Sequence, residues 1–570
     1  MIIRYLMKML RWTWTVLLAG CFVTLSAQPV SHWGDQGDGT FRNPILRADY
    51  SDPDPIRVGN DYYLVSSTFE SYPGVTILHS RDLVNWETVG AAFHHLDRVC
   101  SDYTWQRMNR YNGGVYAPTI AYHEGKFYIY ANLYTDGFYM AWAERPEGPW
   151  TEQMLKDKNG RSLRVLHWTD PCPFWDEDGR AYLVASHPGR QYWYSYLFQM
   201  SADGTQLLDA DSAHMAQMPC HYQWPDGGTC ISPYHSSEGN RIFKRNGYYY
   251  LQHIEFTNQG QGEGTYIFRA RNIYGEGGRP GHPGQYEVRC IEHVTDRSNM
   301  RLPGQGGYVT TPDGRWWWIG QFTRDDAEGR VPYLVPVHWQ DDWPVMDNTP
   351  ERMDKPIQGY APQLPVGSDD FTMIATPHSQ RENHAPLTLN PQWQWNHTPR
   401  NDYWSLSERK GWLRLHAFQP QGKQKGFFGA GNSLYQRYVR GEQTIVTTRI
   451  DIRHITDGAQ AGLAIFNGGK SYSRIGIQDG QLFVDENNQQ GERVVLPQRT
   501  KYIYLRAVIN NEAQATWQYS RDGSRYQNIG TTYQLVPGNF QGAMIGLYCY
   551  NEQADRGYAD FDYFDYELKH

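Results

Sequence analysis

The sequence predicts an all-β protein, in which a five-bladed β-propeller is followed by a β-sandwich of the jelly-roll type. Long amphipathic helical stretches are hard to find, aromatic residues make up 15% of the chain, and one hairpin motif recurs five times. Aromatic residues favour strands, and the 55 glycines favour tight turns. The chain of 570 residues is also too long for a single hydrophobic core.

The recurring motif is a turn with a glycine, followed by two or three aromatic or apolar residues. Its glycines are Gly59, Gly125, Gly179, Gly247 and Gly314, at intervals of 66, 54, 68 and 67 residues. Glycine supplies the positive φ of a tight hairpin turn, and the residues that follow are strand formers. Because each interval has room for about four strands, the repeats predict five radial blades.

Two domains follow from this pattern: a propeller over residues 41–348 and a sandwich over residues 366–570. A Pro-rich, turn-rich stretch from Pro350 to Pro365 separates them. Beyond it, alternating strands such as 444–450, 461–466 and 502–508 come with few helix signals. That pattern favours a sandwich.

The N-terminus, residues 1–27, has the features of a signal peptide. Arg4, Lys8 and Arg11 precede an apolar stretch that ends in Leu-Ser-Ala at Ala27. We therefore expect a secreted protein, in the periplasm or outside the cell. The alternative is a lipoprotein anchored through Cys21, which ends a Leu-Ala-Gly-Cys sequence. No later segment is long and apolar enough to span a membrane.

Charge and composition narrow the class of partner. The net charge is −8 and no basic block is present, so we expect no nucleic-acid partner. Aromatic rings pack well on the apolar faces of sugars, although the same rings are common in the cores of β-proteins. Composition alone therefore favours an ordinary β-core, with a carbohydrate ligand as the alternative.

Three of the five repeats carry a carboxylate shortly before the glycine. These are Asp54 in the segment Asp52-Pro53-Asp54-Pro55, Asp170 and Glu238. Each precedes a blade's inner strand, so we expect all three to point into one funnel. Asp-Pro is also a frequent start of a turn, and oxygen ligands can bind calcium, so both readings stay open.

A cluster of this kind suits the cleavage of glycosides. A general acid protonates the leaving oxygen while a carboxylate activates water on the opposite face of the sugar. Inverting enzymes hold the two groups roughly 6.5–9.5 Å apart, which leaves room for the water. A third carboxylate near the acid raises its pKa and keeps it protonated.

Across nearly the whole mature chain, these segments resemble glycoside hydrolase family 43, the inverting β-xylosidases and α-L-arabinofuranosidases. The segments that carry the resemblance are Asn43-Pro44-Ile45-Leu46, Asp52-Pro53-Asp54-Pro55, Tyr62-Tyr63-Leu64-Val65, His79-Ser80-Arg81-Asp82-Leu83-Val84-Asn85-Trp86, Gly114-Val115-Tyr116-Ala117-Pro118, Asp170-Pro171 and Glu238-Gly239-Asn240. The resemblance implies that Asp54 is the general base and Glu238 the general acid. Asp170 would tune the pKa of Glu238 and orient it.

The resemblance also implies a set of residues that bind the sugar. Arg330 looks like the family's arginine that binds sugar hydroxyls, and Phe69 and Tyr72 look like walls of the terminal-sugar pocket. No cofactor is expected to be required. Many members have a histidine in blade five that helps to hold a central ion, whereas this chain has Gln305 in Gly-Gln-Gly-Gly. A structural Ca²⁺ is therefore left open.

The C-terminal region resembles the concanavalin A-like sandwich of many such enzymes, through segments such as Trp393-Gln394-Trp395-Asn396-His397 and Gly557-Tyr558-Ala559-Asp560-Phe561. In relatives this module packs on the propeller and can close one side of the pocket. The alternative is a purely structural sandwich.

Together these features predict an inverting, exo-acting hydrolase that removes a terminal pentose from a plant polysaccharide or oligosaccharide. α-L-Arabinofuranose from hemicellulose is the first expectation. The alternatives are a β-xylosidase that acts on xylo-oligosaccharides and a glycan-binding protein without activity. A retaining fructan-active propeller would need Trp and Asn beside its nucleophile, and Asp54 lacks those neighbours.

Overall fold

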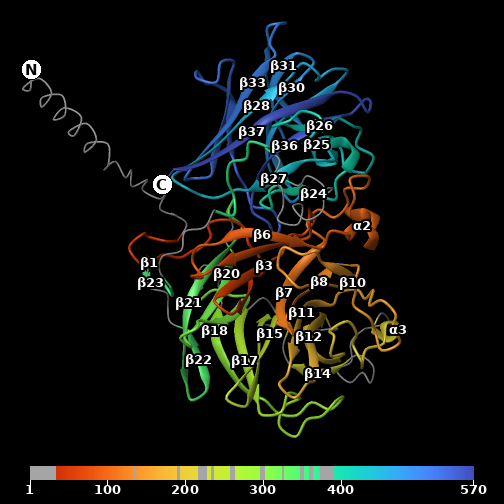
Figure 1. The fold of residues 1–570 in the computed structure, drawn as a ribbon, viewed down its shortest axis with the longest axis vertical. Helices are drawn as coiled ribbons and strands as arrows, with labels where there is room; N and C mark the ends of the chain where they lie inside the picture. Colours follow the sequence, from red (N-terminus) through yellow and green to blue (C-terminus); the bar gives the residue numbers. More distant parts are fainter. Residues whose placement is uncertain are drawn as a thin grey trace, which may run out of the picture.

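The computed structural model describes residues 34–133, 135–188, 193–215, 228–232, 236–256, 263–294, 302–323, 326–346, 352–357, 364–372 and 389–569. The predicted signal peptide and Cys21 lie outside these ranges. Within them the chain forms five four-stranded sheets followed by a two-sheet sandwich. In Figure 1 the sandwich, in blue, lies above the propeller, which runs from red to green. The predicted fold class is confirmed.

The five sheets are the predicted blades, and each takes its four strands from one continuous stretch of chain. Their strands are β2 (Asp54–Val58), β3 (Asp61–Ser66), β5 (Val75–Ser80) and β6 (Glu87–Ala92); β7 (Val115–His123), β8 (Lys126–Leu133), β9 (Phe138–Ala143) and β10 (Thr151–Met154); β11 (Thr169–Trp175), β12 (Ala181–Pro188), β13 (Trp193–Met200) and β14 (Thr229–Ser232); β15 (Ser236–Arg245), β16 (Tyr248–Phe256), β17 (Glu263–Ala270) and β18 (Glu287–Val294); β19 (Gly306–Thr310), β20 (Trp316–Thr323), β21 (Arg330–Gln340) and β22 (Trp343–Met346).

The repeat glycines stand where the sequence places them, in the turn between the first and second strands of each blade. All five have φ between 65° and 85°, a region that side-chain-bearing residues rarely adopt. At Gly59 a β-carbon would meet no atom within 4 Å, so the turn needs the backbone conformation rather than the space.

The propeller ring is closed by pairing between the start of the chain and the last blade. The side chain of Asn43 donates to the Leu334 carbonyl over 2.9 Å and accepts from the Leu334 amide over 2.8 Å. The Tyr50 amide donates to the Arg330 carbonyl, and β1 (Thr40–Phe41) pairs with β23 (Met353–Asp354). The Asn-Pro segment therefore fixes the first blade against the fifth.

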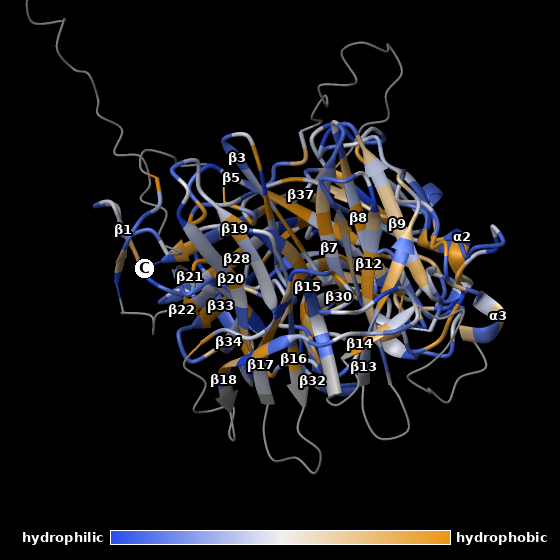
Figure 2. Ribbon diagram, turned by 90° about the horizontal axis from the view of Figure 1, so that it is seen from below, coloured by the Kyte–Doolittle hydropathy of each residue, from blue (hydrophilic) through white to orange (hydrophobic). Residues whose placement is uncertain are grey.

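The sandwich has an eight-stranded and a seven-stranded sheet. Their remaining strands are β24 (Gln394–Asn396), β25 (Trp404–Ser405), β26 (Leu413–His416), β27 (Leu434–Arg437), β28 (Gln443–Asp451), β29 (Ala459–Asn467), β30 (Ser471–Gln478), β31 (Gln481–Glu486), β32 (Gln489–Val495), β33 (Tyr502–Asn510), β34 (Gln514–Ser520), β35 (Gln527–Gln534), β36 (Met544–Asn551) and β37 (Tyr558–Lys569). Buried side chains of both sheets, such as Leu463 and Trp517, belong to one core cluster. Figure 2 shows apolar residues along strands such as β8 and β12 and mostly hydrophilic loops.

Helices are few and short in the described ranges, among them α2 (Leu96–Val99) and α3 (Ser212–Met215). No helix in those ranges is both long and apolar enough to cross a membrane.

The two domains share one sheet. Strand β4 (Ser71–Tyr72) lies between blade-one strands in the sequence, yet it forms the edge of the eight-stranded sheet of the sandwich. It pairs with β24 through Tyr72 opposite Trp395 and Ser71 opposite Asn396. Figure 1 shows β24 and β27 next to blade one. This shared strand fixes the sandwich at the mouth of the propeller.

Candidate active site

A cleft of about 530 Å³ lies where the blades' inner strands begin, against the sandwich. Its walls carry the carboxylates of Asp52, Asp170 and Glu238 and the guanidinium of Arg330. Asn539 and Phe540 of the sandwich complete the lining. Both domains therefore build the site, and the alternative of a purely structural sandwich does not fit this geometry.

Residues with left-handed backbones gather around the cleft. Asp52, Phe69, Ala117, His167 and Asp170 have φ of 54°, 53°, 39°, 65° and 52°. Such conformations are costly for residues with side chains and concentrate at functional sites. Asp170 sits where the pairing of β11 with β12 shifts register, and Ala117 sits at a similar shift in β7. These two irregularities lie at the starts of β11 and β7, beside the cleft.

Asp52 is held by three donors. Its carboxylate accepts hydrogen bonds from the hydroxyl of Ser67, from Nε2 of Gln321 over 3.0 Å and from Nη1 of Arg330 over 3.0 Å. Ser67 is itself oriented, because its Oγ accepts from the amide of Ala117 over 2.7 Å.

Asp170 lies beside the segment that carries Glu238. Its carboxylate accepts from the backbone N–H of Gly239, and its carbonyl accepts from the side chain of Asn240 over 3.2 Å. Burial raises the pKa of Asp170 and the negative charge of Asp52 adds to that shift, whereas the Thr169 hydroxyl and the Gly239 amide lower it. Asp170 and Glu238 are therefore brought together at the cleft, as expected.

Asp54 is not brought to the cleft, which corrects the expectation that it points into the funnel. Its Oδ1 lies 2.8 Å from Nε of Arg241, and its Oδ2 accepts from the Ile120 amide over 2.9 Å. A β-carbon on Gly307 would approach its Oδ1 to 2.5 Å. Burial raises the pKa of Asp54 and the charge of Arg241 opposes that shift. Asp54 thus ties inner strands of different blades together, and Asp52 occupies the cleft instead.

Of the three predicted sugar-binding residues, one lines the cleft and two do not. Arg330 lines the cleft and contacts Asp52, and its backbone N–H is held by the carboxylate of Asp49 over 3.1 Å. Phe69 is fully buried and supports the wall, because its ring stacks on Phe540 at 6.1 Å. Tyr72 is in the strand shared with the sandwich, where its hydroxyl donates to the His94 carbonyl over 3.3 Å. It does not reach the cleft.

The sequence reasoning missed Asp52 and Phe540 as site residues. A signal for Asp52 existed: counted back from the repeat glycine, Asp170 and Glu238 lie nine residues away, Asp52 seven and Asp54 five. The Asp-Pro sequence of Asp170 does not separate the two, because both Asp52 and Asp54 precede a proline. Phe540 comes from a loop far along the chain, and nothing in its local sequence marks it as part of the cleft.

A central calcium ion stays a prediction, because Gln305 offers a side-chain carbonyl oxygen that can bind calcium as well as N–H groups that cannot. Gln305 lines the cleft, and in the described part of the chain its buried Nε2, a hydrogen-bond donor, has no partner. An amide N–H cannot bind a cation. No group of three or more His, Cys, Asp or Glu side chains in the described ranges is arranged for a metal ion.

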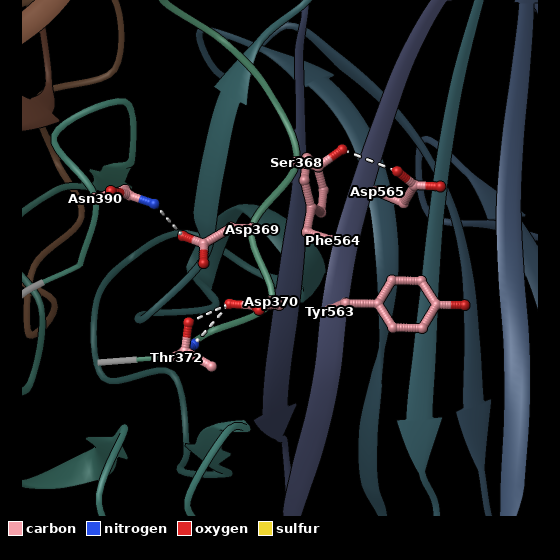
Figure 3. Close-up of a pocket in the computed structure, with 8 residues that line it drawn as sticks. All are labelled: Ser368, Asp369, Asp370, Thr372, Asn390, Tyr563, Phe564 and Asp565. Atoms are coloured by element: carbon pink, nitrogen blue, oxygen red, sulfur yellow. Dashed lines mark hydrogen bonds between the residues drawn. The ribbon is translucent and has the colours of Figure 1, made fainter. Parts of the chain in front are cut away.

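A second cavity, of about 580 Å³, lies on the sandwich (Figure 3). Its carboxylates are already engaged within the chain. Asp369 accepts from Asn390 over 3.1 Å, Asp370 from the Thr372 amide over 2.9 Å and Asp565 from Ser368 over 2.8 Å. These bonds fix the segment that leads into the sandwich, and we assign the cavity no catalytic function.

Comparison with protein families gives two matches. The model described as glycosyl hydrolases family 43 matches residues 41–344, and the model described as the beta xylosidase C-terminal concanavalin A-like domain matches residues 381–567.

Individual relatives are similar over nearly the whole chain. A beta-xylosidase of Formosa agariphila is 31% identical over 94% of this chain and 91% of its own length. A putative beta-xylosidase of Xylanibacter ruminicola is 34% identical, over 92% and 89% respectively. A non-reducing end alpha-L-arabinofuranosidase of Bacteroides ovatus is 26% identical, over 92% and 94%. Among solved structures, a bifunctional GH43-CE protein of Bacteroides eggerthii is 30% identical with a TM-score of 0.74; the match covers 93% of this chain and 64% of that longer chain.

Proposed function

The chain belongs to glycosyl hydrolase family 43, and from this premise we propose that it releases a terminal pentose from the non-reducing ends of xylan-type glycans by inversion. The observation that carries the proposal is the cleft itself. It holds three carboxylates and two arginines, Arg110 and Arg330, and one of its walls is Phe540 of the second domain. A pocket closed on one side suits a single terminal sugar better than the interior of a chain.

The three carboxylates divide the catalytic work in this proposal. Asp52 is the general base that takes a proton from water, and the donors from Ser67, Gln321 and Arg330 orient it. Glu238 is the general acid that protonates the leaving oxygen. Asp170 raises the pKa of Glu238 by its negative charge and orients it through the neighbouring Gly239 amide. The assignment of Asp52 replaces the expectation for Asp54.

For the sugar, we place β-D-xylose first and α-L-arabinofuranose second. Sequence reasoning put arabinofuranose first. The relatives cited above at 31% and 34% identity are named a beta-xylosidase and a putative beta-xylosidase, however, and the cited relative named as an arabinofuranosidase is 26% identical. A family 43 pocket that recognises one pentose can accept the other because the two present similar hydroxyl patterns.

The proposal is tested with 4-nitrophenyl β-D-xyloside and 4-nitrophenyl α-L-arabinofuranoside, with an Asp52→Asn/Glu238→Ala double variant as the matched inactive control. We expect release from the xyloside at the higher kcat/KM and weaker release from the arabinofuranoside. Proton NMR of the first product should show α-xylose from the β-xyloside. No release of either pentose contradicts the substrate, and β-xylose as the first product contradicts inversion.

We further propose that the enzyme is exported and cleaved after Ala27, with lipidation of Cys21 as the alternative. The basic and apolar segments of residues 1–27 support export. Mass spectrometry of the N-terminal peptide from the native host distinguishes the two. Gln28 as the first residue supports cleavage, and a diacylated Cys21 supports the alternative.

A further inference from the structure

The loop 538–543 of the sandwich brings Phe540 to the cleft, and this residue is 40% exposed. Three contacts place the ring: it stacks on Phe69 at 6.1 Å, meets the edge of Tyr116 at 6.0 Å and lies 5.2 Å from the guanidinium carbon of Arg330. The loop therefore sets the shape of the pocket from outside the propeller.

The residue after Phe540 is the loop's anchor. Gln541 is 4% exposed, and its Nε2 donates to Oε2 of Glu70 over 3.1 Å. The same oxygen accepts the backbone N–H of Asn112, another residue of the cleft wall, over 3.2 Å. One carboxyl oxygen of Glu70 thus joins the sandwich loop to the propeller segment that carries Asn112.

Glu70 is an unusual choice for a structural anchor. It is 3% exposed, and within the described part of the chain it forms no ion pair. The titratable side chains that face it are Asp49, before blade one, and the phenols of Tyr111 and Tyr435. None of these supplies a positive charge, so its hydrogen bonds come from neutral amide groups. An ionised carboxylate is costly in such a place.

We propose that Glu70 is a positioning residue, which fixes the pocket wall by holding Gln541 of the sandwich and Asn112 of the propeller on one carboxyl oxygen. The inference deepens the proposed pentosidase function and rests on it only for the kinetic readout. Glu70 touches no substrate in this scheme and acts through Phe540.

The protonation state of Glu70 gives the inference a second consequence. Burial raises the pKa of Glu70 to about 8, against hydrogen bonds from its own amide, Asn112 and Gln541 that lower it. Because the pKa is raised on folding, its contribution to stability is complete below the unfolded pKa near 4.5 and is lost as pH rises through about 8. The loop should therefore loosen at alkaline pH in the wild type. A glutamine, whose carbonyl can accept both bonds without charging, should prevent this.

The test compares Glu70→Ala, Glu70→Gln and Gln541→Ala by steady-state kinetics on the nitrophenyl glycosides and by hydrogen exchange of peptides that cover 538–543 and 109–116. We expect KM to rise about tenfold in Glu70→Ala and in Gln541→Ala, with faster exchange in both peptides. The Glu70→Ala/Gln541→Ala double variant should have the same KM as each single variant, because both substitutions remove the same Glu70–Gln541 hydrogen bond. The KM of Glu70→Gln should stay within about twofold of the wild-type KM near pH 6. Above pH 8 the KM of this variant should rise less than the KM of the wild type does.

Gln394→Ala is the matched control, since Gln394 is buried at the same junction and donates to the Pro73 carbonyl over 3.4 Å without lining the cleft. It should lower the unfolding temperature and leave KM unchanged. The inference is overturned if Glu70→Ala changes only the unfolding temperature, with KM and exchange as in the wild type. If Glu70→Ala does not fold, an alkaline rise in KM that is equal in Glu70→Gln and the wild type overturns it. An inactive wild type would instead contradict the proposed function, while the exchange data would still decide the role of Glu70.

Discussion

Two aspartates that stand two residues apart, Asp52 and Asp54, occupy opposite environments at the start of blade one. Asp52 faces the cleft and receives hydrogen bonds from Ser67, Gln321 and Arg330. Asp54 lies behind the cleft lining, where its charge is compensated by Arg241 of blade four. The difference teaches that a buried ion pair and a catalytic carboxylate place different demands on the same residue type. The first needs a permanent partner, and the second needs an open face toward the substrate.

The largest effect is expected for Asp52, the aspartate that faces the cleft. Asp52→Asn removes the proposed base but keeps an acceptor for its donors, so kcat should fall about a thousandfold while the fold stays intact. Initial rates on the nitrophenyl xyloside and thermal unfolding of the same preparations check this. Asp54→Asn is the control, and its folded fraction should keep kcat within about tenfold of the wild type. A reversal, with Asp54→Asn inactive and Asp52→Asn active, would restore the original assignment of the base.

The second effect is on stability. Asp54→Leu removes the carboxylate that pairs with the buried Arg241, and breaking a buried pair in this way costs about 3–5 kcal/mol. Urea unfolding followed by tryptophan fluorescence measures the free energy of unfolding. Combining it with Arg241→Met should recover much of the loss, because the pair is then replaced by apolar groups. If Asp54→Leu is as stable as the wild type, Asp54 is not the structural member of the comparison.

The sequence predicted the blades because their cause is local. Each of the five glycines must adopt a positive φ in a hairpin turn, and the spacing of that requirement is visible without a structure. It also predicted Asp170 and Glu238 at the cleft, because both stand at the same distance before their glycine. Their catalytic roles are still proposals.

The choice between Asp52 and Asp54 failed because it depends on non-local geometry. In a regular strand, residues two apart point to the same face, so both aspartates could have faced the funnel. The left-handed backbone of Asp52 breaks that alternation, and the presence of Arg241 in another blade decides where Asp54 points. Phe540 and the strand shared through Tyr72 were out of reach for a similar reason, since both depend on how two domains pack.

The third effect concerns the carboxylate that tunes the acid. Asp170→Asn removes a negative charge next to the Glu238 segment, so the pKa of Glu238 should fall and the alkaline limb of kcat/KM should move to lower pH by about one unit. At the optimum, kcat should fall about tenfold to a hundredfold, less than for Asp52→Asn. A pH–rate profile from about pH 4 to about pH 9 measures both the alkaline limb and kcat at the optimum. This range covers the pH values at which ordinary and raised carboxyl groups titrate. An alkaline limb that stays in place would show that Asp170 only orients.

Removal of metal ions is expected to have the smallest effect. The experiment tests whether the cleft carboxylates need a cation, as Asp54 needs Arg241. Protein donors already meet them: Arg330 and Gln321 bind Asp52, and the Gly239 amide binds Asp170. The position at which the resemblance implies a histidine holds Gln305, whose N–H groups cannot bind a cation although its carbonyl oxygen can. We therefore expect dialysis against EDTA to leave kcat within about twofold and the unfolding temperature unchanged. Added calcium should have no further effect on either. Loss of activity that calcium restores would mean that the cleft carboxylates also depend on a fixed positive charge. Asp52 and Asp54 would then both need a cation, and they would differ only in whether that cation is a metal ion or Arg241.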